Sequence, residues 1–299
     1  MRISERHRYD ITTSRVEQAK SNNSKLLRQM STQKQINQLS DDPIGNSQVI
    51  RHRTRLSQNG QFLKNIEYAT GFLERTEGAI MGMSDAVLRA KELAIGMSNS
   101  TYGPAAREGT AQEVKQLIEG VISLANTSFG NRFVFGGFRT QTPPLSGDGQ
   151  YLGDDGSVFI QIDEGSFKKI NINARQLFEA GEEERQNGHF NLIHSLKILQ
   201  TGLQDDDIPM IRKSMEELDH QLNKMSTYQA RIGAIQNTLT SVRTRAESGE
   251  ELTTEAISNL EDADLFKTSS DFKRTESVLQ STLMASTKLL QPSLLNFLQ

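Results

Sequence analysis

Residues 62–97 read FLKNIEYATGFLERTEGAIMGMSDAVLRAKELAIGM, and apolar side chains recur through this stretch at alternating spacings of four and three. Residues spaced in this way share one face of a helix, so the pattern predicts a helix that packs lengthwise along another helix. The positions of this seam are Phe62, Ile66, Ala69, Leu73, Thr76, Ile80, Met83, Val87, Ala90, Ala94 and Met97. The stretch therefore favours a mainly α fold built on long, coiled-coil-like helices.

A second stretch, in the C-terminal half, repeats the spacing. None of the six prolines falls within 44–103 or 210–291, and proline breaks helix interiors, so both ranges can form long helices. We predict one helix over 43–99, weakened near Gly60, and another that breaks at Ser248–Gly249 before a last helix. Together they form an antiparallel bundle. The predicted bundle seam comprises Phe62, Ile66, Leu73, Ile80, Val87, Ile211, Leu218, Leu222, Met225 and Ile232.

The two ends of the chain differ in character. The first 36 residues are basic and carry few apolar side chains, whereas the last ten residues are strongly apolar. A helix with a narrow apolar stripe buries too little on its own to offset its loss of conformational entropy, so it needs a partner. We predict that the ends pair with each other and with further subunits. This predicted assembly interface comprises Ile3, Ile11, Val16, Leu26, Met30, Leu279, Leu283, Leu290, Leu294, Leu295, Phe297 and Leu298.

The middle of the chain has a different pattern. Short β-like runs at Val158–Ile162 and Ile170–Ile172 lie between Gly- and Asp-rich turns, which is typical of a small β-rich insert on a helical body. We therefore expect three domains. A terminal helical assembly domain is formed by 1–42 with 255–299, a central helical bundle by 43–140 with 190–254, and a small β-rich outer insert by 141–189.

No pattern in the sequence indicates an enzyme. The chain has no cysteine, which excludes disulfides, zinc–thiolate sites and cysteine nucleophiles. The glycines of 130–137 lack the spacing of a phosphate loop, and the five histidines form no His-Glu-x-x-His motif. Asp205–Asp207 precede a helix start, where carboxylates favour the helix dipole without any ion. We predict no catalytic residue, no metal site and no cofactor.

Nucleic acid and membrane partners are not expected either. The basic N-terminal arm lacks aromatic side chains for stacking on bases, and its charges do not gather on one helix face. No apolar run reaches the roughly 18 residues of a membrane span. The first residues lack the apolar core of a cleaved signal peptide.

Three segments, in order along the chain, resemble the flagellin superfamily. Lys34–Pro43, KQINQLSDDP, is similar to the K-x-I-N-x-x-x-D-D-P stretch near the flagellin N-terminus. Arg231–Asn237, RIGAIQN, is similar to R-x-x-G-A-x-Q-N, and Asp262–Asp264 to the D-A-D start of the last helix. The resemblance covers about 1–145 and 210–299.

Within the superfamily, the chain most resembles the hook-associated protein 3 family of hook–filament junction proteins. Its first residues, Met1–Ser4, and its ending, Ser293–Leu298, are similar to that family's. The segment 131–144, NRFVFGGFRTQTPP, resembles the family's G-R-Y-x-F-x-G-x-x-T-x-T-P-P, with Asn131 where a glycine is common. The insert resembles no part of the family that we identify.

The resemblance implies a structural adaptor that joins the flagellar hook, through a first junction protein, to the flagellin filament. Implied partners are identical subunits in a ring, the first junction protein, flagellin, and an export chaperone. The implied location is the extracellular hook–filament junction, reached by the flagellar type III route without a cleaved signal. The main alternative is a flagellin filament subunit of the same fold, which the segment 131–144 disfavours. An unrelated coiled-coil binding module is disfavoured by the order of the three segments, and an enzyme is the least favoured reading.

Overall fold

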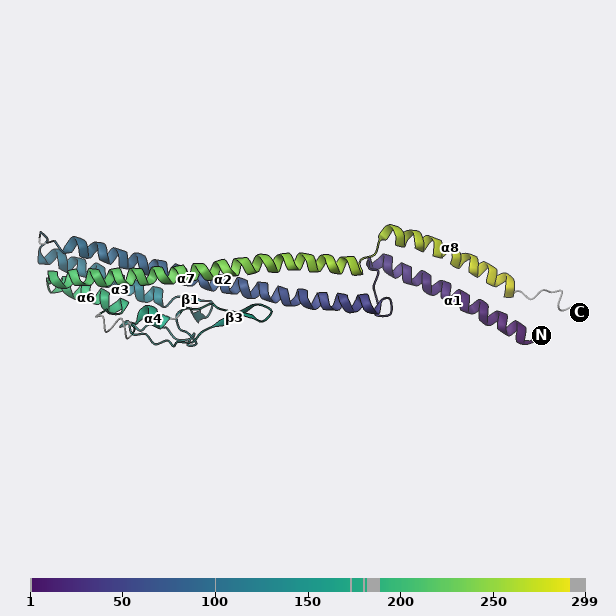
Figure 1. The fold of residues 1–299 in the computed structure, drawn as a ribbon, viewed down its shortest axis with the longest axis horizontal. Coiled ribbons are helices and arrows are strands. Elements are labelled where there is room, and N and C mark those ends of the chain that lie inside the picture. Colours follow the sequence, from purple (N-terminus) through teal and green to yellow (C-terminus); the bar gives the residue numbers. More distant parts are fainter. Residues whose placement is uncertain (1, 100, 173, 180, 182–188, 291–299) are drawn as a thin grey trace, which may run out of the picture. The chain divides into compact units, whose positions relative to one another are not determined.

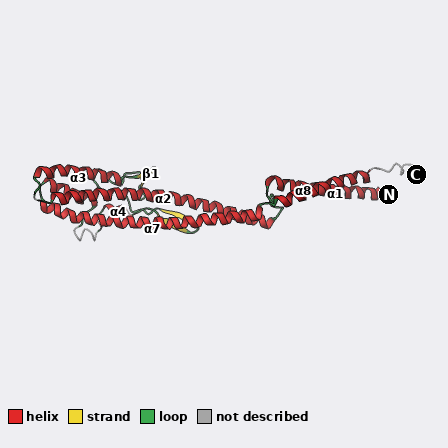
Figure 2. Cartoon of the chain, turned by 90° about the horizontal axis from the view of Figure 1, so that it is seen from above, coloured by secondary structure: helices red, strands yellow, loops and turns green. Residues whose placement is uncertain are grey.

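The computed structural model describes residues 2–99, 101–172, 174–179, 181 and 189–290. Helices dominate the described residues, and the strands form two small antiparallel sheets (Figures 1 and 2). The helices are α1 Arg2–Thr32, α2 Pro43–Met97, α3 Pro104–Ala125, α4 Ala174–Phe178, α6 Leu192–Gln204, α7 Ile208–Glu261 and α8 Leu265–Leu290. The strands are β1 Ser128–Phe129, β2 Arg132–Phe133, β3 Phe159–Asp163 and β4 Ser166–Lys169. The predicted mainly α fold with a small β insertion is confirmed.

The two longest helices are continuous. α2 passes through Gly60, and α7 passes through Ser248–Gly249, where a break was predicted and is absent. One glycine costs a helix interior only about 1 kcal/mol relative to alanine, which the helix on either side offsets. At the second position the Gly249 carbonyl also accepts a hydrogen bond of 2.6 Å from the Thr253 hydroxyl one turn later. The predicted interruption at Ser248–Gly249 is therefore wrong.

Aspartates cap the starts of the two longest helices, α2 and α7. The Asp42 carboxylate accepts the N–H groups of Ile44 and Gly45 at 3.0 and 2.9 Å, directly before α2. Asp207 accepts the Met210 N–H at 3.0 Å at the start of α7. These carboxylates satisfy N–H groups that have no partner inside the helix and lie at the positive end of its dipole. Asp207 thus serves as the helix cap that the acidic run before Pro209 indicated.

The core of the bundle lies along the heptad seams. Of the predicted seam residues, Ile66, Leu73, Ile80, Val87, Ile211, Leu218 and Ile232 are fully buried, Met225 is 1% exposed, and Phe62 and Leu222 are half-buried. Thr76, the polar member of the α2 seam, is also fully buried. Its hydroxyl donates a hydrogen bond of 2.8 Å to the Phe72 carbonyl, so its burial leaves no unpaired donor.

The insert contains a hairpin of β3 and β4. The first β-like run, Val158–Ile162, corresponds to β3, but the second, Ile170–Ile172, is not a strand. β3 pairs instead with β4, Ser166–Lys169, which directly precedes this run. Ile170 and Ile172 are buried in the core. The Asn171 side chain donates to the Gly156 carbonyl at 2.7 Å and accepts the Val158 N–H at 2.8 Å. The Ile170 N–H still donates to the Val158 carbonyl at 3.0 Å, and the side-chain bonds of Asn171 take the place of strand pairing beyond it.

Contacts divide the chain into two compact units. The first unit comprises 1–58 and 248–299, and the second comprises 59–247. The finer division into three domains, with boundaries near 42, 140, 190 and 255, stays a prediction. Among the described residues, no helix is both long and apolar enough to cross a membrane.

Candidate assembly interface

The first unit contains a pair of terminal helices. α1 and α8 run antiparallel and contact each other along their length (Figures 1 and 2). A groove of about 1000 Å³ lies between them. Its lining is Ile11, Thr12, Arg15, Gln18, Ala19, Asn22, Arg274, Ser277, Val278, Ser281, Thr282 and Ala285. Small and polar side chains dominate this lining, so the pair does not close a compact apolar core between its helices.

The structure places the predicted interface residues unevenly. Val16, Leu26 and Met30 on α1 and Leu279 on α8 are half-buried. Ile11 and Leu283 are 41% and 45% exposed. Ile3 and Leu290 lie within the helices, but their side chains are outside the described set, as are residues Leu294, Leu295, Phe297 and Leu298. The helix pairing thus brings part of the predicted set together and leaves Ile11 and Leu283 facing solvent.

Two connections join this helix pair to the long helices. Residues 33–42 link α1 to α2, and residues 262–264 link α7 to α8. The Gln35 N–H donates to the Glu261 carbonyl at 2.6 Å, and the Ala263 N–H donates to the Gln33 carbonyl at 2.9 Å. Lys34 and Asp262 form an antiparallel bridge between them. The two connections are therefore bound together by their backbones.

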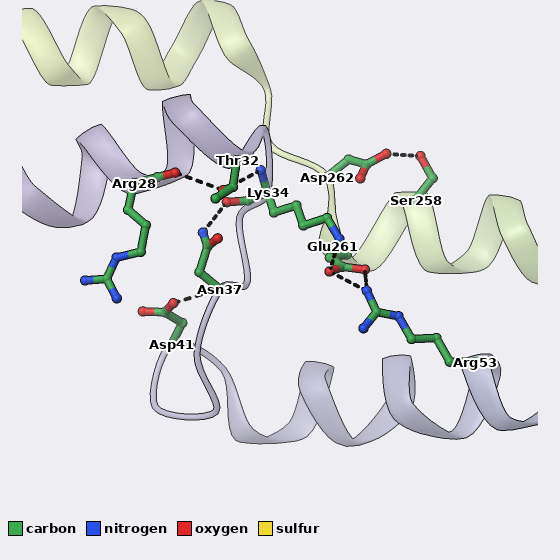
Figure 3. A network of polar contacts seen from close by, with 9 residues as sticks. All are labelled: Arg28, Thr32, Lys34, Asn37, Asp41, Arg53, Ser258, Glu261 and Asp262. Atoms are coloured by element: carbon green, nitrogen blue, oxygen red, sulfur yellow. Dashed lines mark hydrogen bonds and ion pairs between the residues drawn. The ribbon is translucent and has the colours of Figure 1, made fainter.

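Glu261, at the end of α7, is the ionic centre of this junction (Figure 3). Its carboxylate is 7% exposed and lies 2.8 Å from the Lys34 ammonium and 2.6 Å from the Arg53 guanidinium. Arg53 reaches both carboxylate oxygens, at 2.8 and 2.6 Å. A buried carboxylate needs such partners because its desolvation is costly. One side chain thereby ties α7, α2 and the first connection together.

The connection 33–42 is also stabilised by hydrogen bonds between its own residues. The Asn37 side-chain amide donates to the Lys34 carbonyl at 2.7 Å (Figure 3). One Asp41 oxygen accepts the N–H groups of Asn37 and Gln38 at 3.2 and 3.1 Å, while the Lys25 ammonium of α1 lies 3.0 Å from the other. Burial alone would raise the pKa of Asp41, but the bonds from Lys25 and the two N–H groups outweigh it and lower the pKa.

The same segment contains a close contact at a glycine. Ile36 is 8% exposed, and a Cβ atom added at Gly45 would lie 2.9 Å from its Cδ1 atom and would also collide with Asp42. A larger residue at this position would push the Ile36 side chain off the start of α2. The residues of the segment 34–43 thus have identified structural roles. They supply an ion pair, a buried anchor, turn bonds and a helix start: Lys34, Ile36, Asn37, Asp41, Asp42 and Pro43.

Sequence analysis missed two charged residues. Glu261 was not singled out, although it directly precedes the D-A-D segment, and that position could have drawn attention. Arg107, in the second unit, was missed because no local pattern marks it. Its side chain is 3% exposed and donates to the Met97 and Asn99 carbonyls at 3.0 and 3.1 Å. It also pairs with Asp206, which has a left-handed backbone with φ of 57°.

The charged side chains gathered here position the backbone segments of the junction. Each charged group of the junction is engaged in an ion pair, a turn bond or a helix cap. Within the described residues, no group of three or more His, Asp or Glu side chains is arranged to hold a metal ion.

Comparison with known proteins identifies the family. The bacterial flagellin N-terminal helical region matches residues 3–140, and the bacterial flagellin C-terminal helical region matches residues 215–298. Flagellar hook-associated protein 3 of Salmonella typhimurium is 26% identical over 97% of this chain and 97% of that protein. The Escherichia coli protein of the same name is 27% identical over 87% and 88%. Flagellin of Bacillus subtilis is 22% identical over 91% and 90%.

Solved structures show the same fold. Bacillus cereus FlgL superposes with a TM-score of 0.60 at 22% identity, covering 70% of this chain and 99% of that one. The flagellar junction protein FlgL from Legionella pneumophila gives 0.60 at 13% identity, covering 72% and 100%. The two matched helical regions span most of the sequence and include the junction of 33–42 with 261–264. The chain belongs to the flagellin superfamily.

Proposed function

We propose that the protein is a structural adaptor of the bacterial flagellum, joining the hook, through a first junction protein, to the flagellin filament. Alignment with hook-associated protein 3 over 97% of both chains supports this function. Flagellin is the second candidate, because Bacillus subtilis flagellin also aligns over most of its length. The segment 131–144, which resembles the junction family, favours the adaptor.

The observation that carries an assembly role is the sparse core of the first unit. Among the side chains described in 1–58 and 248–299, Ile36 and Val49 are the only buried apolar ones. Large apolar side chains instead remain exposed on the terminal helices: Tyr9, Ile11, Leu27, Leu265, Phe266, Val278, Leu283 and Met284. Exposed apolar area of this extent is typical of a surface that another chain covers. The terminal helices are therefore suited to pack among neighbouring subunits.

The partners follow from the same proposal. Identical subunits form a ring, the first junction protein lies on the hook side, and flagellin lies on the filament side. The chain reaches the extracellular junction through the flagellar type III route without a cleaved signal, and an export chaperone covers the apolar terminal helices beforehand. A first unit with so little core of its own suits an exported chain whose ends become ordered during assembly.

Deletion of the gene tests the adaptor function. Electron microscopy of the deletion strain should show hooks without filaments, with flagellin in the medium, and the intact gene should restore filaments. Full-length filaments on the deletion strain would refute the proposal. The flagellin alternative makes a different prediction, because the chain would then be the main protein of sheared filaments rather than a trace component.

A further inference from the structure

The hairpin of β3 and β4 presents phenylalanines to solvent. Phe159 and Phe167 are 60% and 63% exposed. In the register, Phe167 lies opposite Gln161, two residues beyond Phe159, so the rings are diagonal neighbours on one face. The opposite face holds Ile162, which is buried in the core. Because the solvent face of an antiparallel sheet is ordinarily polar, two exposed phenylalanines indicate a contact surface.

The outer side of α2 carries a second apolar surface, here called the outer stripe and formed by Met81, Leu88 and Ile95. These side chains are 57%, 48% and 55% exposed. They follow one another at intervals of seven residues, about two helical turns, so they lie in a line along the helix. The stripe is separate from the buried seam of the same helix.

The outer stripe and the hairpin lie on opposite sides of α2. The Asn65 side-chain amide donates to the Gln161 carbonyl at 2.8 Å, so the Asn65 side of α2 meets the hairpin. An α-helix turns about 100° per residue, so around the axis of α2 the Met81 side chain lies about 160° from that of Asn65. The Leu88 side chain lies about 140° from it. One copy therefore cannot close a contact between its own stripe and hairpin. A contact between two copies through these surfaces is heterologous and can repeat from copy to copy.

The two surfaces are complementary in charge. Lys169 lies opposite Phe159 in the register, and Lys168 precedes it. On the stripe side, Glu74 lies seven residues before Met81, and Asp85 lies between Met81 and Leu88. Within the described residues, none of these four side chains forms an ion pair, whereas nearby Arg89 is already paired with Glu92 and Glu113. Lys168 lies opposite Ile160 on the other face, so the phenylalanine face of the hairpin offers the cation of Lys169, and the stripe offers carboxylates.

The dimensions of the surfaces also agree. Diagonal neighbours of an antiparallel pair lie about 7–8 Å apart. Successive stripe residues are separated by about 10 Å along the helix axis. One hairpin therefore covers about one interval of the stripe, with its two rings on either side of a single stripe side chain.

We propose that the β3–β4 hairpin of one copy packs on the outer stripe of the next copy. Phe159 and Phe167 lie on either side of Leu88, and Lys169 lies near Asp85. The contact repeats head to tail and joins adjacent copies in the second unit, independently of the terminal helices. It rests on the proposed function in one respect, because assembly in the flagellum is what brings the copies together.

Cross-linking tests the contact directly, since the natural chain has no cysteine. The full chain carrying both Ser84→Cys and Gln161→Cys is expressed in the deletion strain, and isolated flagella are treated with a short bismaleimide. The double variant should give a ladder of dimers and larger multimers. Each single variant should give monomer alone, and the two single variants expressed together should give dimers but no larger species. Dimers from either single variant, or monomer alone from the double variant, would overturn the proposal.

A matched pair of substitutions tests the apolar contribution. In the double-cysteine background, Phe167→Asp should reduce the multimer bands at least tenfold. Leu152→Asp changes a side chain that is 43% exposed and lies outside the hairpin, so it should leave the ladder unchanged. A ladder that survives Phe167→Asp would overturn the contact.

Immunoblotting of the flagellar fraction separates the two proposals. If the double-cysteine chain is present in flagella but gives no ladder, the hairpin contact is wrong and the adaptor function stands. If the wild-type chain is absent from flagella, the adaptor function is wrong, and the contact is overturned with it.

Discussion

Replacing Arg107 by Met tests how strongly one buried guanidinium stabilises the second unit. The side chain is 3% exposed and donates to the Met97 and Asn99 carbonyls at 3.0 and 3.1 Å. Met97 is the last residue of α2, so these bonds fix the turn before α3. The ion pair with Asp206 fixes the turn between α6 and α7. One side chain from α3 therefore holds two turns.

The expected loss follows from the number of bonds. A hydrogen bond to a charged group contributes about 1.5–3 kcal/mol, and two carbonyl bonds are lost together. Asp206 is 44% exposed, so water can replace its lost partner, and we discount that ion pair. The sum for the two carbonyl bonds is about 3–6 kcal/mol. A domain of this size loses about 2–4 °C in Tm per kcal/mol, so Tm should fall by about 10 °C.

Circular dichroism melting of the purified full chain measures this shift. Arg89→Met provides the control, because Arg89 also pairs with two carboxylates but is half exposed. Exposed ion pairs contribute about 0–1 kcal/mol, so the control should shift Tm by no more than about 4 °C. Arg107→Lys keeps the charge but cannot reach all three acceptors, and its Tm should fall between the others. Equal shifts for Arg107→Met and Arg89→Met would refute the reasoning.

Three further substitutions test the polar contacts between the connections 33–42 and 262–264, and the insert. Glu261→Gln removes the carboxylate from between its two cations and should cost about 1–3 kcal/mol, seen as faster amide exchange in residues 33–41. The Asp41 carboxyl has a pKa below its ordinary 3.8, so its stabilising contribution is complete above that pH and is lost as the pH falls further. In Asp41→Asn, the rate of amide hydrogen exchange at Gln38 should no longer show the pH dependence that this carboxylate causes. Burial, and to a lesser extent nearby carboxylates, raises the pKa of Tyr151 from 10.0 to about 12. The free energy of unfolding should therefore fall as the pH rises above 10, and Tyr151→Phe should weaken that fall.

Features that depend on local sequence were predictable. The heptad spacing identified Ile66, Leu73 and Ile80 as core residues because burial along a helix repeats with the helix period. The Asp42–Pro43 start of α2 was predictable because a cap and its N–H partners lie within three residues. In both cases the residues that decide the structure are close together in the chain.

Features that depend on distant residues were not predictable. The helix was expected to break at Ser248–Gly249 because glycine and serine have low helix propensity, yet α7 continues for more than ten residues beyond them. Ile170 and Ile172 have strand-forming side chains, but burial against the bundle and the bonds of Asn171 determine their conformation. The partners of Arg107 come from two separate parts of the chain, the turn at Met97–Asn99 and the distant Asp206, so no short window of sequence contains them all.

The two units are ordered by different kinds of contact. In the second unit, the core is closed within one chain, and sequence periodicity found the part of it that lies along α2 and α7. In the first unit, two buried apolar side chains are described, and order depends instead on the ion pairs of Glu261, the turn bonds of Asp41 and the two backbone hydrogen bonds that bridge the connections. Polar contacts fix geometry but contribute little net stability, since water competes for each group. The polar contacts therefore fix the geometry of the two connections, and under the proposed function apolar contacts with a neighbouring chain would add the stability that the terminal helices lack.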